Sequence, residues 1–169
     1  DFVENITIRS FTEMLSDGPL DFQPGSRYQY SPAGGLDVVA RLIEITSNQP
    51  FNEFVQDSIF IPLDMHDTHW RVPDDKLARI VVISGGSKGG SKYPAYDTKF
   101  FSGSVGLVST GQDYLHLHQM LINGGEYKGK RILSQKSLEL MSTNQAGRLF
   151  SKTEKGEGMG CGYAVSLTL

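Results

Sequence analysis

A proline–glycine turn that leads into an aromatic run constrains this chain more than any other feature. Pro24-Gly25 predicts a turn, because proline fixes one backbone angle and glycine tolerates positive φ. Arg27 to Tyr30 is then expected to form a short extended segment. Ser31-Pro32 has the residue types of a helix N-cap and first helical position. The pattern therefore predicts that Tyr30 stands directly before a helix.

Helical patterns bounded by glycine and proline occupy much of the remaining sequence. We expect capping boxes at Ser10-x-x-Glu13 and Ser109-x-x-Gln112, and an N-cap at Ser134. Apolar spacing and these end signals predict helices at about residues 8–16, 32–47, 50–58, 110–122 and 134–143. The expected buried faces are Leu36, Val39, Ala40 and Ile43 in the second helix, Phe51, Phe54 and Val55 in the third, and Tyr114, Leu117 and Leu121 in the fourth.

Strand signals are few and short. Arg79–Ile83 reads as a strand, Glu126–Leu133 as a small hairpin around Gly129, and Gly162–Leu169 as a further strand. These patterns predict a predominantly helical α+β fold.

Residues 84–92 contain a tandem repeat, in which Gly85-Gly86-Ser87-Lys88 is followed by the same four residues. This composition predicts a flexible loop, and an engineered linker is an open alternative. Gly85-x-Ser87-x-Gly89 also has the spacing of an α/β-hydrolase nucleophile elbow, but Tyr93-Pro94 is a poor start for the helix that an elbow requires. The order Ser91-Lys92 is wrong for a phosphate-binding P-loop.

The bulk properties exclude several classes of function. A chain of 169 residues is one domain's worth of polypeptide, and its formal charge of −3 gives no basic surface for nucleic acid. No apolar run reaches the roughly 20 residues of a membrane span. Cys161 is the only cysteine, which excludes an internal disulfide, and we expect it to be a small buried residue. No basic, apolar leader is visible, so the compartment stays open between periplasmic or extracellular and cytoplasmic.

A metal site is a weak alternative. His66, Asp67 and His69 lie in one predicted turn, but metal sites normally use three or four converging ligands and no further cluster is visible. We therefore expect no metal and no other cofactor.

Several motifs, in order, carry a family resemblance. The Phe22–Ser31 segment is similar to a pattern "PG-x-x-(F/W/Y)-x-Y-S", and Ile59–Thr68 to "PLGM-x-(D/N)-T", with Asp64 where glycine is usual. Phe101–Thr110 is similar to "sGGGLvST". Together they resemble the serine β-lactamase and penicillin-binding-protein-like family, in its class C β-lactamase-like, esterase-like branch. The resemblance implies the helical subdomain and bordering strands of a β-lactamase/transpeptidase-like fold.

The resemblance also implies a chemistry. Enzymes of this family transfer acyl groups through the serine of a Ser-x-x-Lys motif, and a lysine and a tyrosine together handle the proton. Tyr30 occupies the place of that tyrosine, and Ser102 and Gly103 fall where the edge of the substrate cleft would be. Lactamases usually carry asparagine where Pro32 stands, so Pro32 favours a small-molecule ester over a lactam.

Two elements of the family pattern are missing. No lysine of the chain has a serine three residues before it, and the later Lys-Thr-Gly or His-x-Gly strand is absent. We therefore interpret residues 1–169 as one partial domain of a serine hydrolase, inactive alone, whose partners would include the missing segments of the same enzyme. A phenol is a poor base near neutral pH unless cations stabilise the phenolate, and the missing lysine would supply one. The alternatives are a non-catalytic binding module of the same fold and the Ser87 hydrolase.

Overall fold

Helices dominate the architecture, as the sequence predicted. The computed structural model describes residues 5–31, 34–81, 99–151, 159–163 and 165–168. In this part of the chain the strands form two antiparallel two-stranded hairpins, β1 with β2 and β3 with β4. The helices are α1 (Ile8–Ser16), α2 (Gly35–Ser47), α3 (Phe51–Val55), the π-helix η2 (Gln56–Phe60), the 3₁₀ helix η3 (Asp74–Arg79), α4 (Gly111–Ile122), α5 (Gln135–Met141) and α6 (Arg148–Ser151).

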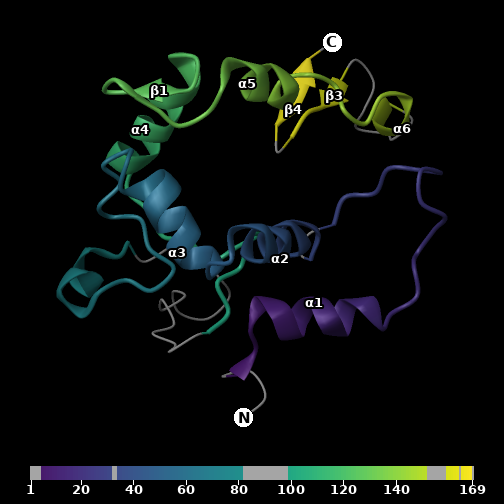
Figure 1. Cartoon of the computed structure of the whole chain (residues 1–169), viewed down its shortest axis with the longest axis horizontal. Helices are drawn as coiled ribbons and strands as arrows, with labels where there is room; N and C mark the ends of the chain where they lie inside the picture. Colours follow the sequence, from purple (N-terminus) through teal and green to yellow (C-terminus); the bar gives the residue numbers. More distant parts are fainter. Residues whose placement is uncertain (1–4, 32–33, 82–98, 152–158, 164, 169) are drawn as a thin grey trace.

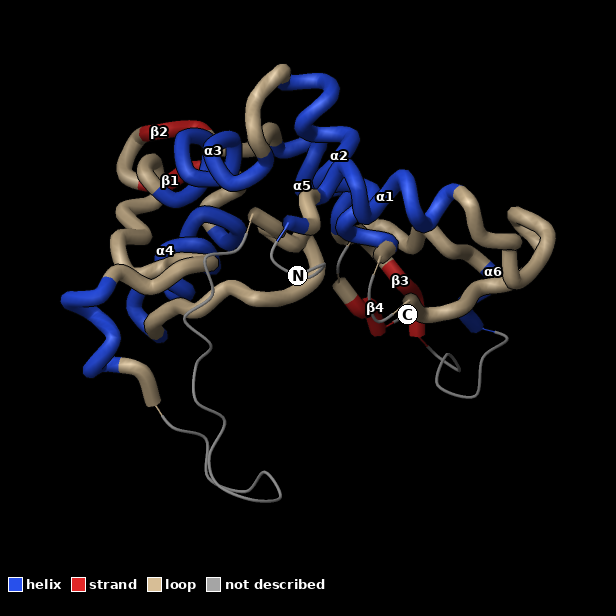
Figure 2. The backbone as a smooth tube through the Cα atoms, turned by 90° about the horizontal axis from the view of Figure 1, so that it is seen from below, coloured by secondary structure: helices blue, strands red, loops and turns tan. Residues whose placement is uncertain are grey.

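The elements follow an open arc rather than a layered sheet. Figure 1 shows α1 beside α2, then α3, α4 and β1 along one side, and α5, the β3–β4 hairpin and α6 along the top. The same neighbours are seen from below in Figure 2. Contacts join α1 to α2, α2 to α3, α4 to β1 and α6 to β3. No helix among the described residues has both the length and the apolarity needed to cross a membrane.

One apolar cluster holds α1 through α4 and the first hairpin together. The third helix buries the face that its sequence predicted, with Phe51 and Val55 inside and Phe54 packed against the cluster. Leu63 is fully buried, which fixes the turn after η2. The buried members are Ile8, Ala40, Phe51, Val55, Phe60, Leu63, Met65, Met120 and Tyr127.

The predicted faces of α2 and α4 were only partly right. In α2, Ala40 is buried and Ile43 packs against the core, but Leu36 and Val39 are 51% and 48% exposed. In α4, Leu117 and Leu121 pack against the core, whereas Tyr114 is exposed. Met120 lies deepest in α4.

Two helices begin where predicted but use other caps. Thr7, not Ser10, caps α1: its hydroxyl accepts from the Ser10 amide at 3.1 Å, and the Ser10 hydroxyl accepts from the Thr7 amide at 2.9 Å. Thr110, not Ser109, caps α4, and its hydroxyl accepts from the Asp113 amide at 3.2 Å. Serine and threonine are both favoured N-caps, so two neighbouring hydroxyl residues leave the exact start of the helix open. Ser134 caps α5, as predicted.

The start of α2 differs from the prediction. The helix begins at Gly35 after Gly34, whose φ of 94° favours glycine, and not at Pro32. Pro32 itself lies outside the described residues. Asn48, with φ of 55°, ends the helix where predicted.

The strand predictions had mixed outcomes. The Glu126–Leu133 hairpin is confirmed, with β1 (Glu126–Tyr127) paired to β2 (Lys130–Arg131) across Gly129. The Arg79–Ile83 strand is wrong at its described end, because Arg79 closes η3 and neither Ile80 nor Val81 is in a strand. The C-terminal strand is shorter, as β4 (Ser166–Thr168), and pairs with an unpredicted β3 (Met159–Cys161). The 84–92 loop, including Ser87, lies outside the described residues.

Candidate active site

The site begins at the predicted turn. The Ser26 amide donates to the Gln23 carbonyl at 3.0 Å, and Gly25 has a φ of 79°, which explains the Pro24-Gly25 pair. The Arg27 guanidinium lies 4.6 Å from the centre of the Phe22 ring and braces the turn. The segment after the turn, up to Tyr30, pairs with no strand in the described residues.

The two tyrosines after this turn occupy different surroundings. Tyr28 meets the Phe150 ring edge-on at 4.9 Å, and burial, followed by the nearby Cys161 thiol, raises the pKa of Tyr28. Cys161 is half-buried there rather than fully buried. Tyr30 is 74% exposed, and its hydroxyl makes no hydrogen bond within the described residues. Tyr28 therefore anchors the segment, and Tyr30 is presented to solvent.

A buried carboxylate fixes the helix that follows Tyr30. Asp37 is 2% exposed and lies in the first turn of α2. Its Oδ1 accepts from the Ser102 hydroxyl at 2.7 Å and the Gly103 amide at 2.8 Å. Its Oδ2 accepts from the Gly34 amide at 3.2 Å and the Ser104 hydroxyl at 3.1 Å. Four donors thus satisfy this carboxylate, which ties the 102–104 loop to the start of α2.

Ser102 and Gly103, expected at a substrate cleft, form the base of this loop. The buried Ser102 hydroxyl also accepts from the Ser104 and Val105 amides at 3.0 and 3.1 Å. A Cβ on Gly103 would lie 2.6 Å from the Leu36 carbonyl oxygen, so only glycine lets the loop approach α2 this closely. The structure shows an anchoring role for both residues, and contact with substrate stays a prediction for them and for Pro32.

A second buried carboxylate joins the other two motif segments. Asp113 of α4 accepts from the Asp67 amide at 2.7 Å and the Thr68 hydroxyl at 2.8 Å. Thr68 and Ser109 hydroxyls lie 2.7 Å apart, and His69 and Val108 form an antiparallel bridge. The Ile59–Thr68 and Phe101–Thr110 segments therefore meet in space.

The segment 66–69, considered above as a weak metal site, instead carries a cluster of ion pairs around Asp67. Arg79 and Lys76 bind the Asp67 carboxylate, each at 2.8 Å, and hold the pKa of that carboxyl well below its usual range. The His69 Nε2 lies 3.3 Å from the Lys76 ammonium, and burial together with that charge lowers the pKa of His69. Within the described ranges, no three His, Cys, Asp or Glu side chains are arranged to hold a metal.

Sequence reasoning missed Asp37 and Asp113 as organising residues. Both stand at the third position of a helix, where an acid is expected for capping alone. Both also accept hydrogen bonds from distant loops. The partners, Ser102 for Asp37 and Asp67 for Asp113, are 65 and 46 residues away along the chain.

These features define a class of protein. An exposed tyrosine after a Pro-Gly turn, a following helix and a serine–glycine loop bound to that helix are the helical part of a β-lactamase and penicillin-binding-protein-like fold. A family model described as Beta-lactamase matches residues 2–168, and the chain belongs to this family.

Named relatives agree with this assignment. Lovastatin esterase from Penicillium rubens is 32% identical over 72% of this chain and 33% of its own length. Penicillin-binding protein 4 from Amycolatopsis lactamdurans is 26% identical over 92% of this chain and 42% of its own. The structure of a simvastatin synthase mutant from Aspergillus terreus shares the fold, with a TM-score of 0.74 and 18% identity over 99% of this chain and 48% of that one. The chain thus spans between a third and a half of these relatives.

Proposed function

We propose that this chain supplies the tyrosine-bearing part of an acyl-serine hydrolase that acts on small-molecule esters or amides. The observation that carries the proposal is the exposed Tyr30 hydroxyl, held between an anchored Tyr28 and a helix fixed by Asp37. Membership of the Beta-lactamase family supports a serine hydrolase.

The proposed chemistry assigns one proton-handling role to Tyr30. A serine hydroxyl attacks the substrate carbonyl, its proton passes to the tyrosine–lysine pair, and the leaving group departs with that proton. Water then attacks the acyl-serine and restores the serine. The serine and lysine belong to a Ser-x-x-Lys segment outside this sequence. Because phenolate formation needs a neighbouring cation, we expect Tyr30 to become a base only when that lysine is present.

The substrate class is proposed to be an ester in preference to a lactam. Pro32 has no side-chain amide, so it cannot hold a lactam's amide group as asparagine does in lactamases of the family. The name of the Penicillium rubens relative records an esterase.

The first experiment labels serine nucleophiles directly. The purified chain and the protein of the full reading frame that contains it are incubated with a fluorophosphonate, and intact masses and adduct peptides are measured. We expect no adduct on the chain and one adduct on the Ser-x-x-Lys serine of the longer protein. An adduct at Ser87 would make this a different hydrolase. A longer protein with neither motif nor adduct would support a non-catalytic binding module.

The second experiment tests Tyr30 in the longer protein. Tyr30→Phe should lower kcat on a p-nitrophenyl ester by about 10²- to 10⁴-fold, the usual contribution of a general acid–base group. Tyr163→Phe removes another exposed tyrosine hydroxyl and should leave kcat unchanged. Equal activity of the Tyr30 variant and the parent would refute the role of Tyr30.

A further inference from the structure

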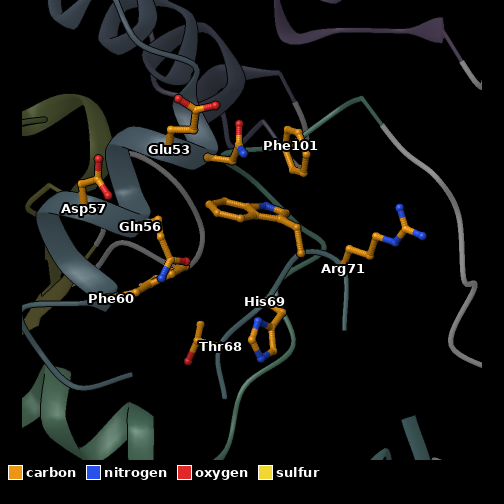
Figure 3. A pocket seen from close by; sticks show the side chains of 10 residues that line it. Glu53, Gln56, Asp57, Phe60, Thr68, His69, Arg71 and Phe101 are labelled. Atoms are coloured by element: carbon orange, nitrogen blue, oxygen red, sulfur yellow. The ribbon is translucent and has the colours of Figure 1, made fainter. Parts of the chain in front are cut away.

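A surface cavity of about 460 Å³ lies between the α3–η2 helix and the segment 68–71. Figure 3 shows its side chains, and Tyr30 is not among them. The volume falls in the range of small-molecule sites in proteins. Tyr30, the proposed catalytic tyrosine, therefore does not line this cavity.

An ordered aromatic wall forms one side of the cavity. Trp70 packs against Phe60 and Phe101, with ring centres 5.8 and 6.0 Å apart. The Trp70 indole N–H donates to the Ser102 carbonyl at 3.0 Å, which fixes the plane of the ring. A ring held in this way offers an apolar, electron-rich surface without having to be ordered when a ligand binds.

Two carboxylates without partners stand at the rim of the same cavity. Glu53 and Asp57 are four residues apart on consecutive helical turns, so they share one side of the helix. In the described part of the chain, neither makes a hydrogen bond or an ion pair. In Figure 3 both carboxylates lie along the outer side of the helix, while Gln56 extends toward Thr68.

The positive groups nearby do not cancel this charge. The Arg71 side chain also borders the cavity but leads away from the other labelled side chains (Figure 3). Burial, followed by the Lys76 ammonium, lowers the pKa of His69 and so disfavours a positive charge on its imidazole. The uncompensated charge of the cavity is therefore negative.

We propose that this cavity binds a small organic cation, with an apolar or aromatic body against Trp70 and an ammonium group at Glu53 and Asp57. Ammonium ions bind favourably both to carboxylates and to the faces of tryptophan and phenylalanine rings. A bare metal ion has no apolar body to bury against the aromatic wall, and the carboxylates of the rim would repel an anion. The site does not depend on the proposed hydrolase activity.

The single tryptophan of the chain makes the test direct, because Trp70 is the only indole fluorophore. We would titrate the chain with phenethylammonium, 2-phenylethanol and phenylacetate, which share a benzyl group and differ in charge. We expect saturable quenching by phenethylammonium, weaker binding of the neutral alcohol and weakest binding of the anion. Equal binding of all three, or no saturable response to the cation, would overturn the proposal.

Matched variants assign the charge. Glu53→Gln and Asp57→Asn should each weaken phenethylammonium binding about threefold to fivefold, the range of exposed ion pairs. Glu139→Gln removes an exposed carboxylate of α5 and should have no effect. All three substitutions lie on the surface, and circular dichroism checks that the fold is retained. Unchanged affinity in the double variant Glu53→Gln/Asp57→Asn would overturn the assignment of the ammonium group.

Discussion

At the scale of single residues, the site is organised by carboxylates that are buried without a cation. Burying a charge is costly unless hydrogen bonds replace its water, and Asp37 accepts four. Two of the donors are backbone amides, which cannot turn away to find another acceptor. The Asp37 carboxylate and the loop therefore depend on each other, because each supplies the hydrogen bonds that replace the water lost by the other.

We predict that Asp37→Asn destabilises the fold by about 1–3 kcal/mol. The NH₂ group of the asparagine would replace an accepting oxygen and face donors, so a buried N–H would lose its acceptor. Urea denaturation followed by circular dichroism measures the change. Asp21→Asn, an exposed position in the turn before Tyr30, is the matched control and should change stability very little. A loss no larger than that of the control would contradict the role given to Asp37.

Asp64 shows how a residue outside the family pattern is accommodated. Its φ of 55° lies in the left-handed region, which explains why glycine is usual at this place in the motif. Aspartate tolerates this conformation better than most residues. Its carboxylate also pairs with Lys128 of the first hairpin at 2.8 Å, which lowers the pKa of Asp64. This ion pair links the turn to the hairpin.

At the scale of elements, Asp67 clamps η3 to the segment 66–69. Arg79 donates to both of its carboxylate oxygens, at 2.9 and 2.8 Å, and Lys76 donates to one. A short 3₁₀ helix has weak internal hydrogen bonds, so such side-chain ties decide whether it is ordered. The same contacts explain why Arg79 ends a helix instead of opening the predicted strand.

This clamp predicts a pH dependence of stability. Since the pKa of Asp67 is depressed in the folded chain, its stabilising contribution is present above the unfolded pKa of about 3.9 and is lost as the pH falls below it. Asp67→Asn should therefore be less stable than the parent at pH 7, and the difference should shrink on acidification to pH 3. Urea midpoints at both pH values measure this.

Asp75→Asn is the control for the clamp, because Asp75 lies exposed in the first turn of the same 3₁₀ helix without a side-chain partner in the described residues. A gap between parent and Asp67→Asn that stays constant from pH 7 to pH 3 would show that the ionised clamp is not its cause.

At the scale of the whole molecule, α2 is apolar around most of its circumference but covered on part of it. Leu36, Val38, Val39, Leu42 and Ile45 are each between 42% and 59% exposed. A helix that is apolar on all sides is normally buried on all sides. Neighbouring apolar side chains on one helix form the kind of surface that binds another polypeptide. We propose that the segments of the same enzyme beyond this sequence cover it.

We therefore predict concentration-dependent self-association of the isolated chain. The double variant Leu42→Lys/Ile45→Glu should shift light-scattering masses toward the monomer, because it places charges in the centre of this surface. Leu20→Lys changes an exposed apolar residue outside α2 and is the control. A parent chain that remains monomeric at all concentrations would refute this prediction.

Local chemistry was sufficient for much of the fold. The Pro24-Gly25 turn, the C-terminal ends of α1 and α2, the burial of Phe51 and Val55 and the hairpin at Gly129 were all predictable. Each depends on the backbone preference or apolar spacing of residues close together in the sequence. The motif order likewise sufficed to indicate the family.

Tertiary structure alone decided the remainder, because those features depend on contacts between distant residues. Thr110 rather than Ser109 caps α4, because the Ser109 hydroxyl lies against that of Thr68. Ser102 was directed to Asp37 rather than to solvent. Sequence patterns report which side chains are apolar or capable of hydrogen bonding. Which partner each one meets is set by the long-range packing that brings the segments together.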